Sequence, residues 1–272
     1  MNRQPANLVI GSFLIGLIAC MAVTALFWTP HVPAAIKLSA KLQAPSTQFW
    51  LGTDEFGRDV VSRLMAGALQ SMIVATLTVA FAVIVGTFAG LLAGYVRGLF
   101  DRVLMVFSDA LLAFPGTLLA LGLMVIAGPN KYGIILALGI AYSPSVLRVV
   151  RGSVLSARER EYVEASRVIG NSELDTMLRH VLPNCIAPIV VLATSMFGWV
   201  VLAESGLSFL GLGVPPPAPT WGNMLAAGRP FIEQAVWLGL FPGLCIALTL
   251  LGINLLGDAL RDKLDPRMRG LK

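Results

Sequence analysis

The amino-acid sequence predicts an all-α integral membrane protein with six transmembrane helices. Two properties of the composition lead to this fold class: 56% of the 272 residues are apolar, with a mean hydropathy of +0.79, and only 13% are charged. Soluble domains usually carry about 25% charged residues. A third observation is that the charges cluster between long uncharged windows. A chain of this length with so little charge has too little polar surface for a water-soluble enzyme.

Each predicted span rests on a long window with few or no charged residues, since crossing a bilayer takes about 20 apolar residues. The windows place helices at about residues 8–28, 70–94, 104–127, 133–150, 185–204 and 234–256. A further window at 205–228 fails because it is interrupted by Pro215, Pro216, Pro217 and Pro219. We divide the chain into an N-terminal region with the first span and an outer loop (1–68), a main transmembrane region (69–258) and a basic tail (259–272).

The first segment has an alternative interpretation as a cleaved signal peptide. The run Leu17-Ile18-Ala19-Cys20 loosely resembles a lipoprotein cleavage box. However, the apolar run continues to Trp28 and only Arg3 precedes it, so we expect an uncleaved first helix.

The basic residues predict the orientation, because Lys and Arg near span ends stay in the cytoplasm. With both termini in the cytoplasm, fourteen of the 20 basic residues are inside and six are outside. The large cytoplasmic segment is then the loop 151–183, and residues 205–232 form an outer hairpin that partly re-enters the membrane. The net charge of +5 is therefore explained mainly by the basic residues that orient the chain in the lipid bilayer. No nucleic-acid partner is expected.

Small residues and prolines indicate where the spans pack or break. Gly86, Gly90 and Gly94 repeat every four residues on one face of the second span, which lets another helix approach closely. The alternative is that they are glycines tolerated in any membrane helix. Pro115 and Pro144 are expected to interrupt the third and fourth spans, which is tolerated only where the backbone is buried in protein or lines a wet cavity. Both are candidate pathway or gate residues.

Two acids lie in or beside spans, where a charge at the bilayer centre costs about 2.5 to 3.5 kcal/mol. Asp109, near the cytoplasmic end of the third span, is a further candidate pathway or gate residue, and it either complements a helix dipole or pairs with Arg148 or Arg151. Glu204 ends the fifth span on the outer side. It either lines a transport pathway or is a plain interfacial charge at a helix end.

The sequence contains no motif for catalysis or metal binding. A Gly-Lys-Ser/Thr phosphate-binding loop, an HExxH pair and a Gly-x-Ser-x-Gly nucleophile elbow are all missing. We therefore predict a non-enzymatic chain with no catalytic residue, no metal site and no cofactor of its own.

The cytoplasmic loop 151–183 contains the most informative motif. It mixes charged and apolar residues, which is typical of a short surface helix with one face offered to a partner. Glu164-Ala165-Ser166 is followed after three residues by Gly170, and later by His180 and Leu182-Pro183. This pattern resembles the EAA loop of the membrane subunits of binding-protein-dependent ABC importers. It departs from that loop at Ser166, which replaces a second alanine, and at His180, which replaces an isoleucine.

Three further segments are similar to the C-type permease subunit of dipeptide, oligopeptide and nickel importers: residues 51–64, 205–213 and 257–266. The resemblance runs from about residue 45 to the C-terminus. It implies the type I ABC importer permease fold.

The resemblance also implies partners and a mechanism. Such a subunit forms a pathway in the bacterial inner membrane with a second, homologous permease. It binds two ATPase subunits, which carry ATP and Mg, and receives substrate from an external, periplasmic binding protein. In this family the EAA helix couples ATP hydrolysis by the ATPases to the movement of the membrane helices. The resemblance therefore implies these coupling residues here: Glu164, Ala165, Ser166, Gly170, Leu182 and Pro183. Dipeptides or oligopeptides are the first expectation for the cargo, and nickel or another metal chelate is the second.

A secondary transporter is a more distant alternative, because it would also have broken helices and acids in the membrane. Such transporters usually consist of two related halves. No convincing repeat relates residues 1–130 to residues 131–272.

The outer loop before the second span has two interpretations. Its motif contains Asp54, Gly57, Arg58, Asp59 and Arg63. Either the arginines pair with the aspartates and fold the loop, or they contact the binding protein.

Overall fold

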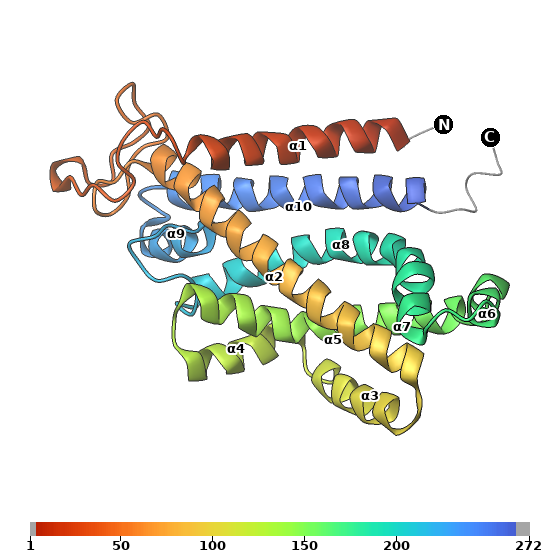
Figure 1. Ribbon diagram of the computed structural model, residues 1–272. Helices are drawn as coiled ribbons and strands as arrows, with labels where there is room; N and C mark the ends of the chain where they lie inside the picture. The colour runs from red at the N-terminus through yellow and green to blue at the C-terminus, as the bar shows by residue number, and fades with distance from the viewer. Residues whose placement is uncertain (1–3, 265–272) are drawn as a thin grey trace.

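The chain is built from helices joined by loops in the computed structural model, which describes residues 4–264 (Figure 1). Within those residues there is no β-strand, only an isolated bridge between Thr53 and Asp59. The α-helices are α1 (Gln4–Thr24), α2 (Val60–Val96), α3 (Gly98–Leu112), α4 (Gly116–Ala127), α5 (Lys131–Ala157), α6 (Glu161–Val168), α7 (Glu173–Thr176), α8 (Leu182–Phe209), α9 (Trp221–Gly228) and α10 (Trp237–Leu264). Short 3₁₀ turns occupy Leu38–Ala40 and Arg229–Phe231, and a π-helical turn occupies Met177–Val181.

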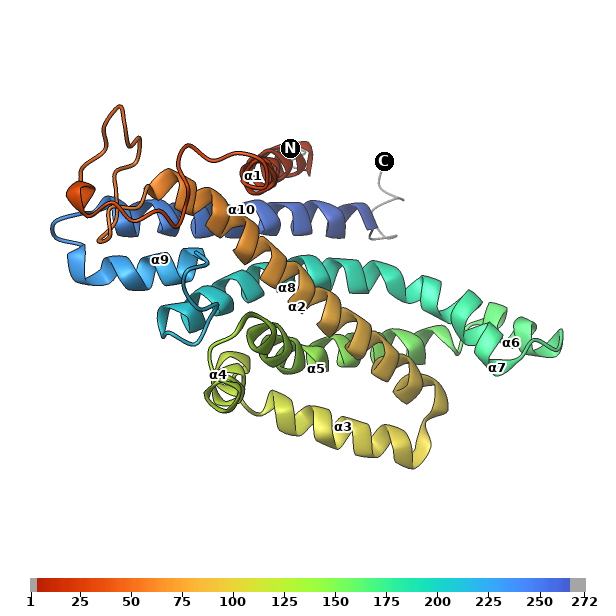
Figure 2. The same cartoon turned by 60° about the vertical axis from the view of Figure 1, so that its left-hand side comes forward.

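In the described part of the chain, five helical segments are long and apolar enough to cross a membrane, or six if α3 and α4 count as one bent span. The interruption of the third span expected at Pro115 is confirmed, whereas the predicted start of that span at residue 104 is wrong. The segment starts earlier, at Gly98, and bends by 88° between α3 and α4 (Figure 2). Pro115 stands at the break, because proline has no N–H to donate and disfavours helical backbone in the residue before it.

The other span boundaries also differ from the predicted ones. α1 ends at Thr24 instead of residue 28, and α10 covers Trp237–Leu264 instead of 234–256. α2 starts ten residues before the predicted residue 70, because the Asp59 carboxylate accepts a hydrogen bond from the Ser62 backbone N–H at 2.9 Å and caps the helix.

Longer helices leave less chain in the loops. α5 continues to Ala157 and α8 starts at Leu182, so the cytoplasmic loop predicted at 151–183 is reduced to residues 158–181. α8 also continues to Phe209, which removes the first residues of the predicted outer hairpin 205–232. The boundaries after residues 68 and 258 fall inside α2 and α10, and residues 265–272 of the basic tail lie outside the described residues.

Pro144 does not interrupt its helix, contrary to expectation. α5 is continuous from Lys131 to Ala157 with Pro144 inside it. Ser143 uses its hydroxyl to donate to the carbonyl oxygen of Gly139 at 2.6 Å. Helices that span membranes tolerate proline when neighbouring helices and such serine contacts support the backbone.

The contact between α2 and α5 is built on the glycine repeat. A Cβ atom added at Gly86, Gly90 or Gly94 would lie 2.5 to 2.8 Å from the Cβ atoms of Val146, Val150 and Val154. Those distances are far below an ordinary van der Waals contact. The three glycines therefore let the two helix backbones come close, and each of them faces a valine of α5.

α1 lies against α10 at the edge of the bundle and runs antiparallel to it (Figure 1). A Cβ at Gly11 of α1 would lie 2.9 Å from backbone atoms of Gly252 and Leu256. The N-terminal end of α1 is thus beside the C-terminal end of α10. Figure 1 shows α6 and α7 at that same end of the molecule, and the loop 25–59 with α9 at the opposite end.

Candidate functional site

Residues 158–181 form a small folded unit made of α6, α7 and the π-helical turn, which we name the coupling loop after the role predicted for it. α6 has two acidic residues, Glu161 and Glu164, in its first turn, where they complement the helix dipole. Val163 is fully buried and points into the unit, whereas Glu164 and Ala165 are exposed. The helix therefore presents one face outward and packs the other against the rest of the loop.

Ser166, one of the predicted coupling residues, does not lie on the outward face of α6, so a partner cannot reach its side chain as the prediction requires. It is 4% exposed, and its hydroxyl lies 3.0 Å from the Thr176 hydroxyl of α7 and accepts from the Asn171 amide at 3.0 Å. A serine at this position provides a hydroxyl that the alanine expected there would lack. Its role in the structure is to tie α6 to α7.

Gly170 ends α6 in the left-handed region, at a φ of +95°, which glycine adopts at no steric cost. The Asn171 N–H donates to the Ser166 carbonyl at 3.2 Å, as in a Schellman motif. Leu182 and Pro183 are the first residues of α8, where proline suits the first turn because its missing N–H would have no partner.

The coupling loop is rich in charged residues, yet several large apolar side chains lie on its outer surface. Five large apolar side chains on it are between 40% and 82% exposed: Tyr162, Val168, Ile169, Leu174 and Leu178. A concentration of exposed apolar side chains in one short segment is typical of a protein-interaction site.

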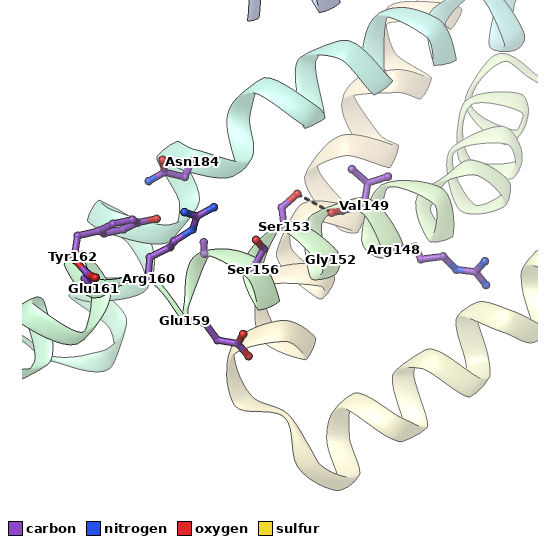
Figure 3. Close-up of a pocket in the computed structure, with 11 residues that line it drawn as sticks. Arg148, Val149, Gly152, Ser153, Ser156, Glu159, Arg160, Glu161, Tyr162 and Asn184 are labelled. Atoms are coloured by element: carbon purple, nitrogen blue, oxygen red, sulfur yellow. Dashed lines mark hydrogen bonds between the residues drawn. The ribbon is translucent and has the colours of Figure 1, made fainter. Parts of the chain in front are cut away.

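An open cavity of about 1090 Å³ lies between the coupling loop, the last turns of α5 and the start of α8 (Figure 3). In Figure 3, Arg160 and Tyr162 of the loop lie near Asn184 of α8. The α5 wall of the cavity consists mainly of polar and small residues: Arg148, Val149, Gly152, Ser153, Ser156 and Ala157. Polar side chains on a spanning helix are costly against lipid, so this face suits water or another protein.

A second, apolar cavity of about 420 Å³ lies between α4, α5 and α8. Tyr142 and Trp199 give it an aromatic wall, and Trp199 is 50% exposed. Tyr142, Val149 and Ser156 are spaced by seven residues, two helical turns, so the walls of both cavities share one face of α5. That open face is partly polar and extends over about 21 Å of α5, from Tyr142 to Ser156.

Asp109 lies on α3 and pairs with Arg148 of α5, with Arg148 Nη2 donating to Asp109 Oδ1 at 2.6 Å. Arg151, the other partner considered, binds Asp101 in a bidentate pair at 2.6 and 2.7 Å. Both pairs connect α3 to α5. Pro115 follows the same helix, at the bend to α4.

Glu204 lies inside α8 and not at its end. Its side chain is fully buried, and it accepts hydrogen bonds from Ser208 at 2.7 Å and from Ser71 of α2 at 3.5 Å. The Ser71 hydroxyl also accepts from the backbone N–H of Trp221 in α9 at 3.4 Å. In this structure Glu204 holds α2, α8 and α9 together, and its place on a transport pathway stays a prediction.

The outer-loop motif folds the loop around Asp54. This carboxylate accepts from Arg58 Nε at 2.6 Å and lies 3.3 Å from Arg63 Nε, and all three side chains are nearly buried. Gly57 has a φ of +72°, and a Cβ there would lie 1.9 Å from the Lys37 carbonyl oxygen. Desolvation by burial also raises the pKa of Glu55 above its ordinary value. The ion pairs of the first interpretation are thus present, while contact with a binding protein stays a prediction.

Within residues 4–264, no three His, Cys, Asp or Glu side chains come close enough to hold a metal ion. Two features were missed by the sequence analysis. The small and polar residues of α5 recur every three or four positions, which helical periodicity could have revealed. The contacts of Tyr95 with the coupling loop, by contrast, join residues more than 70 positions apart and leave no local signal.

Comparison with known proteins gives three kinds of similarity. Residues 86–270 match the family model described as binding-protein-dependent transport system inner membrane component. The chain is 43% identical over 260 residues to a putative peptide transport system permease protein of Brucella suis biovar 1 (strain 1330), covering 96% of this chain and 88% of the relative. It is 41% identical to a dipeptide transport system permease protein of Alkalihalophilus pseudofirmus (96% and 86% covered) and 38% identical to a glutathione transport system permease protein of Pectobacterium atrosepticum (98% and 89% covered). In fold it is similar to a chain of an amino acid ABC transporter crystallised with histidines, with a TM-score of 0.52, 19% identity, and 76% and 92% of the two chains covered.

Proposed function

Because this chain belongs to the family of binding-protein-dependent transport system inner membrane components, we propose that it is the membrane-spanning subunit of an ATP-driven importer for dipeptides or oligopeptides. The observation that carries the proposal is the open face of α5 and α8, with a polar cavity at the coupling-loop end and an apolar one farther along. A second, homologous permease covers this face, and the two chains enclose the pathway between them.

The cavities suit a peptide cargo. A peptide presents both polar backbone groups and side chains of variable polarity, and the two cavities provide polar and apolar walls in turn. The three relatives described above are named for peptides, a dipeptide and glutathione. A nickel or metal-chelate importer remains the second candidate, and it is favoured by none of these names.

The coupling loop is the docking site of the ATPase subunits in this proposal. Its exposed apolar surface fits a groove on a partner, and the exposed carboxylate of Glu164 can meet a cation there. ATP and Mg are bound by those partners. As the ATPases close, the loop moves with them, and α5 and α8 switch the pathway from inward-facing to outward-facing as rigid bodies.

The topology follows from the same proposal. The coupling loop and both termini lie in the cytoplasm of the bacterium, and the chain has the type I permease fold in the inner membrane. The loop 25–59 and α9 then face the periplasm, where the binding protein delivers the substrate. The cytoplasmic excess of Lys and Arg supports this orientation.

Purification of the tagged chain from its own bacterium tests the proposal. We expect a second permease and two ATPases to copurify, and the complex in proteoliposomes to take up a labelled dipeptide only with ATP and the binding protein. Uptake driven by an ion gradient without ATP would identify a secondary transporter instead. ATP-dependent uptake of Ni²⁺ but of no peptide would support the proposed ATP-driven importer and show that its substrate is nickel instead of a peptide.

A further inference from the structure

The coupling loop is held not only by its two chain ends but also by a side-chain cluster at the end of α2. Tyr95, one residue before the end of α2, donates a hydrogen bond from its hydroxyl to Glu173 Oε2, in the first residue of α7. Arg167 of α6 lies over the Tyr95 ring, with 5.7 Å between its Cζ and the ring centroid. Arg167 Nη2 is also 3.4 Å from both the Tyr95 hydroxyl and Glu173 Oε2. One aromatic residue of α2 therefore contacts both helices of the loop.

A second contact joins the same helix end to the start of the loop. Arg158, the first residue after α5, donates from Nη1 to the Tyr95 carbonyl at 3.1 Å and to the Gly94 carbonyl at 3.5 Å. The last carbonyls of a helix have no partners inside the helix and carry the negative end of its dipole. A guanidinium at this point caps α2 and keeps the Tyr95 backbone at a fixed distance from the loop.

We propose that Tyr95, Arg167 and Glu173 form a latch that makes α2 move together with the coupling loop when the ATPases move it. This inference rests on the proposed function, since it concerns how an ATPase movement reaches the membrane helices. The three residues are positioning residues: they act through the loop and touch no substrate.

The packing of the loop explains why such a latch is needed. α6 packs against α7 and the π-helical turn, so its movement would otherwise reach the bundle through the chain connections to α5 and α8 and through the contacts of Arg158 at the start of the loop. α2, in turn, is packed closely on α5 through Gly90 and Gly94. A displacement of Tyr95 is therefore transmitted along α2 and, through the glycine contact, to α5. Without the latch, α2 is held only at the start of the loop, by Arg158 and by the Arg97–Glu159 ion pair, so α6 and α7 can tilt while α2 stays behind.

The test uses the complete importer in proteoliposomes and measures the peptide molecules taken up for each ATP hydrolysed. Tyr95→Phe removes the hydroxyl and keeps the ring. Tyr132→Phe, at a 74% exposed position at the start of α5, makes the same chemical change away from the loop and is the control. We expect Tyr95→Phe to hydrolyse ATP and to lower uptake per ATP by about tenfold, which corresponds to about 1.4 kcal/mol, while Tyr132→Phe keeps the wild-type ratio.

A purely structural role of Tyr95 gives a different result. It would lower uptake and ATP hydrolysis in proportion and leave the ratio unchanged, which would overturn the latch. A second measurement uses Glu173→Ala alone and combined with Tyr95→Phe. Because each change removes the Tyr95–Glu173 hydrogen bond, the double variant should lose no more than Glu173→Ala alone, and additive losses would contradict the proposal.

The two proposals fail in distinguishable ways. If the wild-type complex shows no ATP-dependent uptake, the proposed function is wrong and the latch with it. If the wild type works and Tyr95→Phe keeps the full uptake per ATP, only the latch is wrong.

Discussion

Replacement of Gly90 by alanine should separate α2 from α5, and the structure gives the size of the effect. The new Cβ would lie 2.8 Å from the Val150 Cβ and 2.7 Å from the Leu147 carbonyl oxygen, whereas an ordinary contact is 3.4 to 4 Å. The helices must then move apart by about 1 Å along the contact. Forcing an extra carbon into a well-packed site costs about 1 to 3 kcal/mol, so the folded fraction at the midpoint temperature should fall several-fold or more.

The assay is thermal unfolding of the purified chain in detergent, with Gly16→Ala as the matched control. A Cβ at Gly16 of α1 would have no neighbour within 4 Å, and alanine is a better helix former than glycine by about 1 kcal/mol. The control should therefore be neutral or stabilised, while Gly90→Ala should unfold at a lower temperature. If both variants unfold at the same temperature, the backbone contact between α2 and α5 is not what the glycines provide.

Four other outcomes are expected. Glu164→Arg combined with Gly170→Leu should leave ATP hydrolysis and reduce uptake, because the charge and the helix end that meet the ATPase both change; unchanged uptake would sink the docking role of the loop. Glu204→Leu should lower the unfolding temperature in detergent by leaving buried serine hydroxyls without their acceptor, at about 1 to 3 kcal/mol, and Glu204→Gln should lose less; equal losses would argue against the hydrogen bonds. Asp54→Asn should make the outer loop sensitive to protease, since breaking a buried ion pair costs about 3 to 5 kcal/mol, and a protected loop would refute this. Because burial raises the pKa of Glu55, the carboxyl is more easily protonated in the folded loop, so loop stability should rise as the pH falls toward 4.5, and Glu55→Gln should remove that dependence in the same protease assay.

The sequence predicts the order of the membrane segments because a charge inside a bilayer is costly, so uncharged windows mark the spans. The boundaries were less predictable, because a charge can lie within a helix once it has a partner. Arg63 lies inside α2 beside Asp54, and Glu204 lies inside α8 beside Ser208. These partners come from other turns or other segments, and composition alone does not reveal them.

The two prolines show a second limit of sequence reasoning. Pro115 and Pro144 carry the same local signal, yet the chain bends by 88° at the first and continues as a helix through the second. The difference depends on the surroundings. α5 is packed against α2, α4 and α8 along its length, and that packing holds the helix together across Pro144. Pro115 stands between α3 and α4, at a position where its own side chain is exposed.

For the candidate site, too, part of the result is predictable from the sequence and part depends on tertiary contacts. The spacing from Glu164 to Pro183 locates the coupling loop because such a motif is local in sequence. Which of its residues face outward depends on α7, whose Thr176 buries Ser166 in the unit. A one-dimensional pattern identifies the segment, and the tertiary contact decides which face of it a partner can reach.

One helix connects the regions at the two ends of the molecule. α2 has 37 residues, which at 1.5 Å per residue makes it about 55 Å long. Asp59 caps it in the outer loop, Ser71 binds Glu204, and Tyr95 contacts the coupling loop at the other end. Because a continuous helix is stiff along its axis, a displacement at Tyr95 must also be felt beside Glu204 and α9. In an importer, this geometry would let the state of the ATPases reach the face that receives the substrate through a single element, without a relay of separate movements.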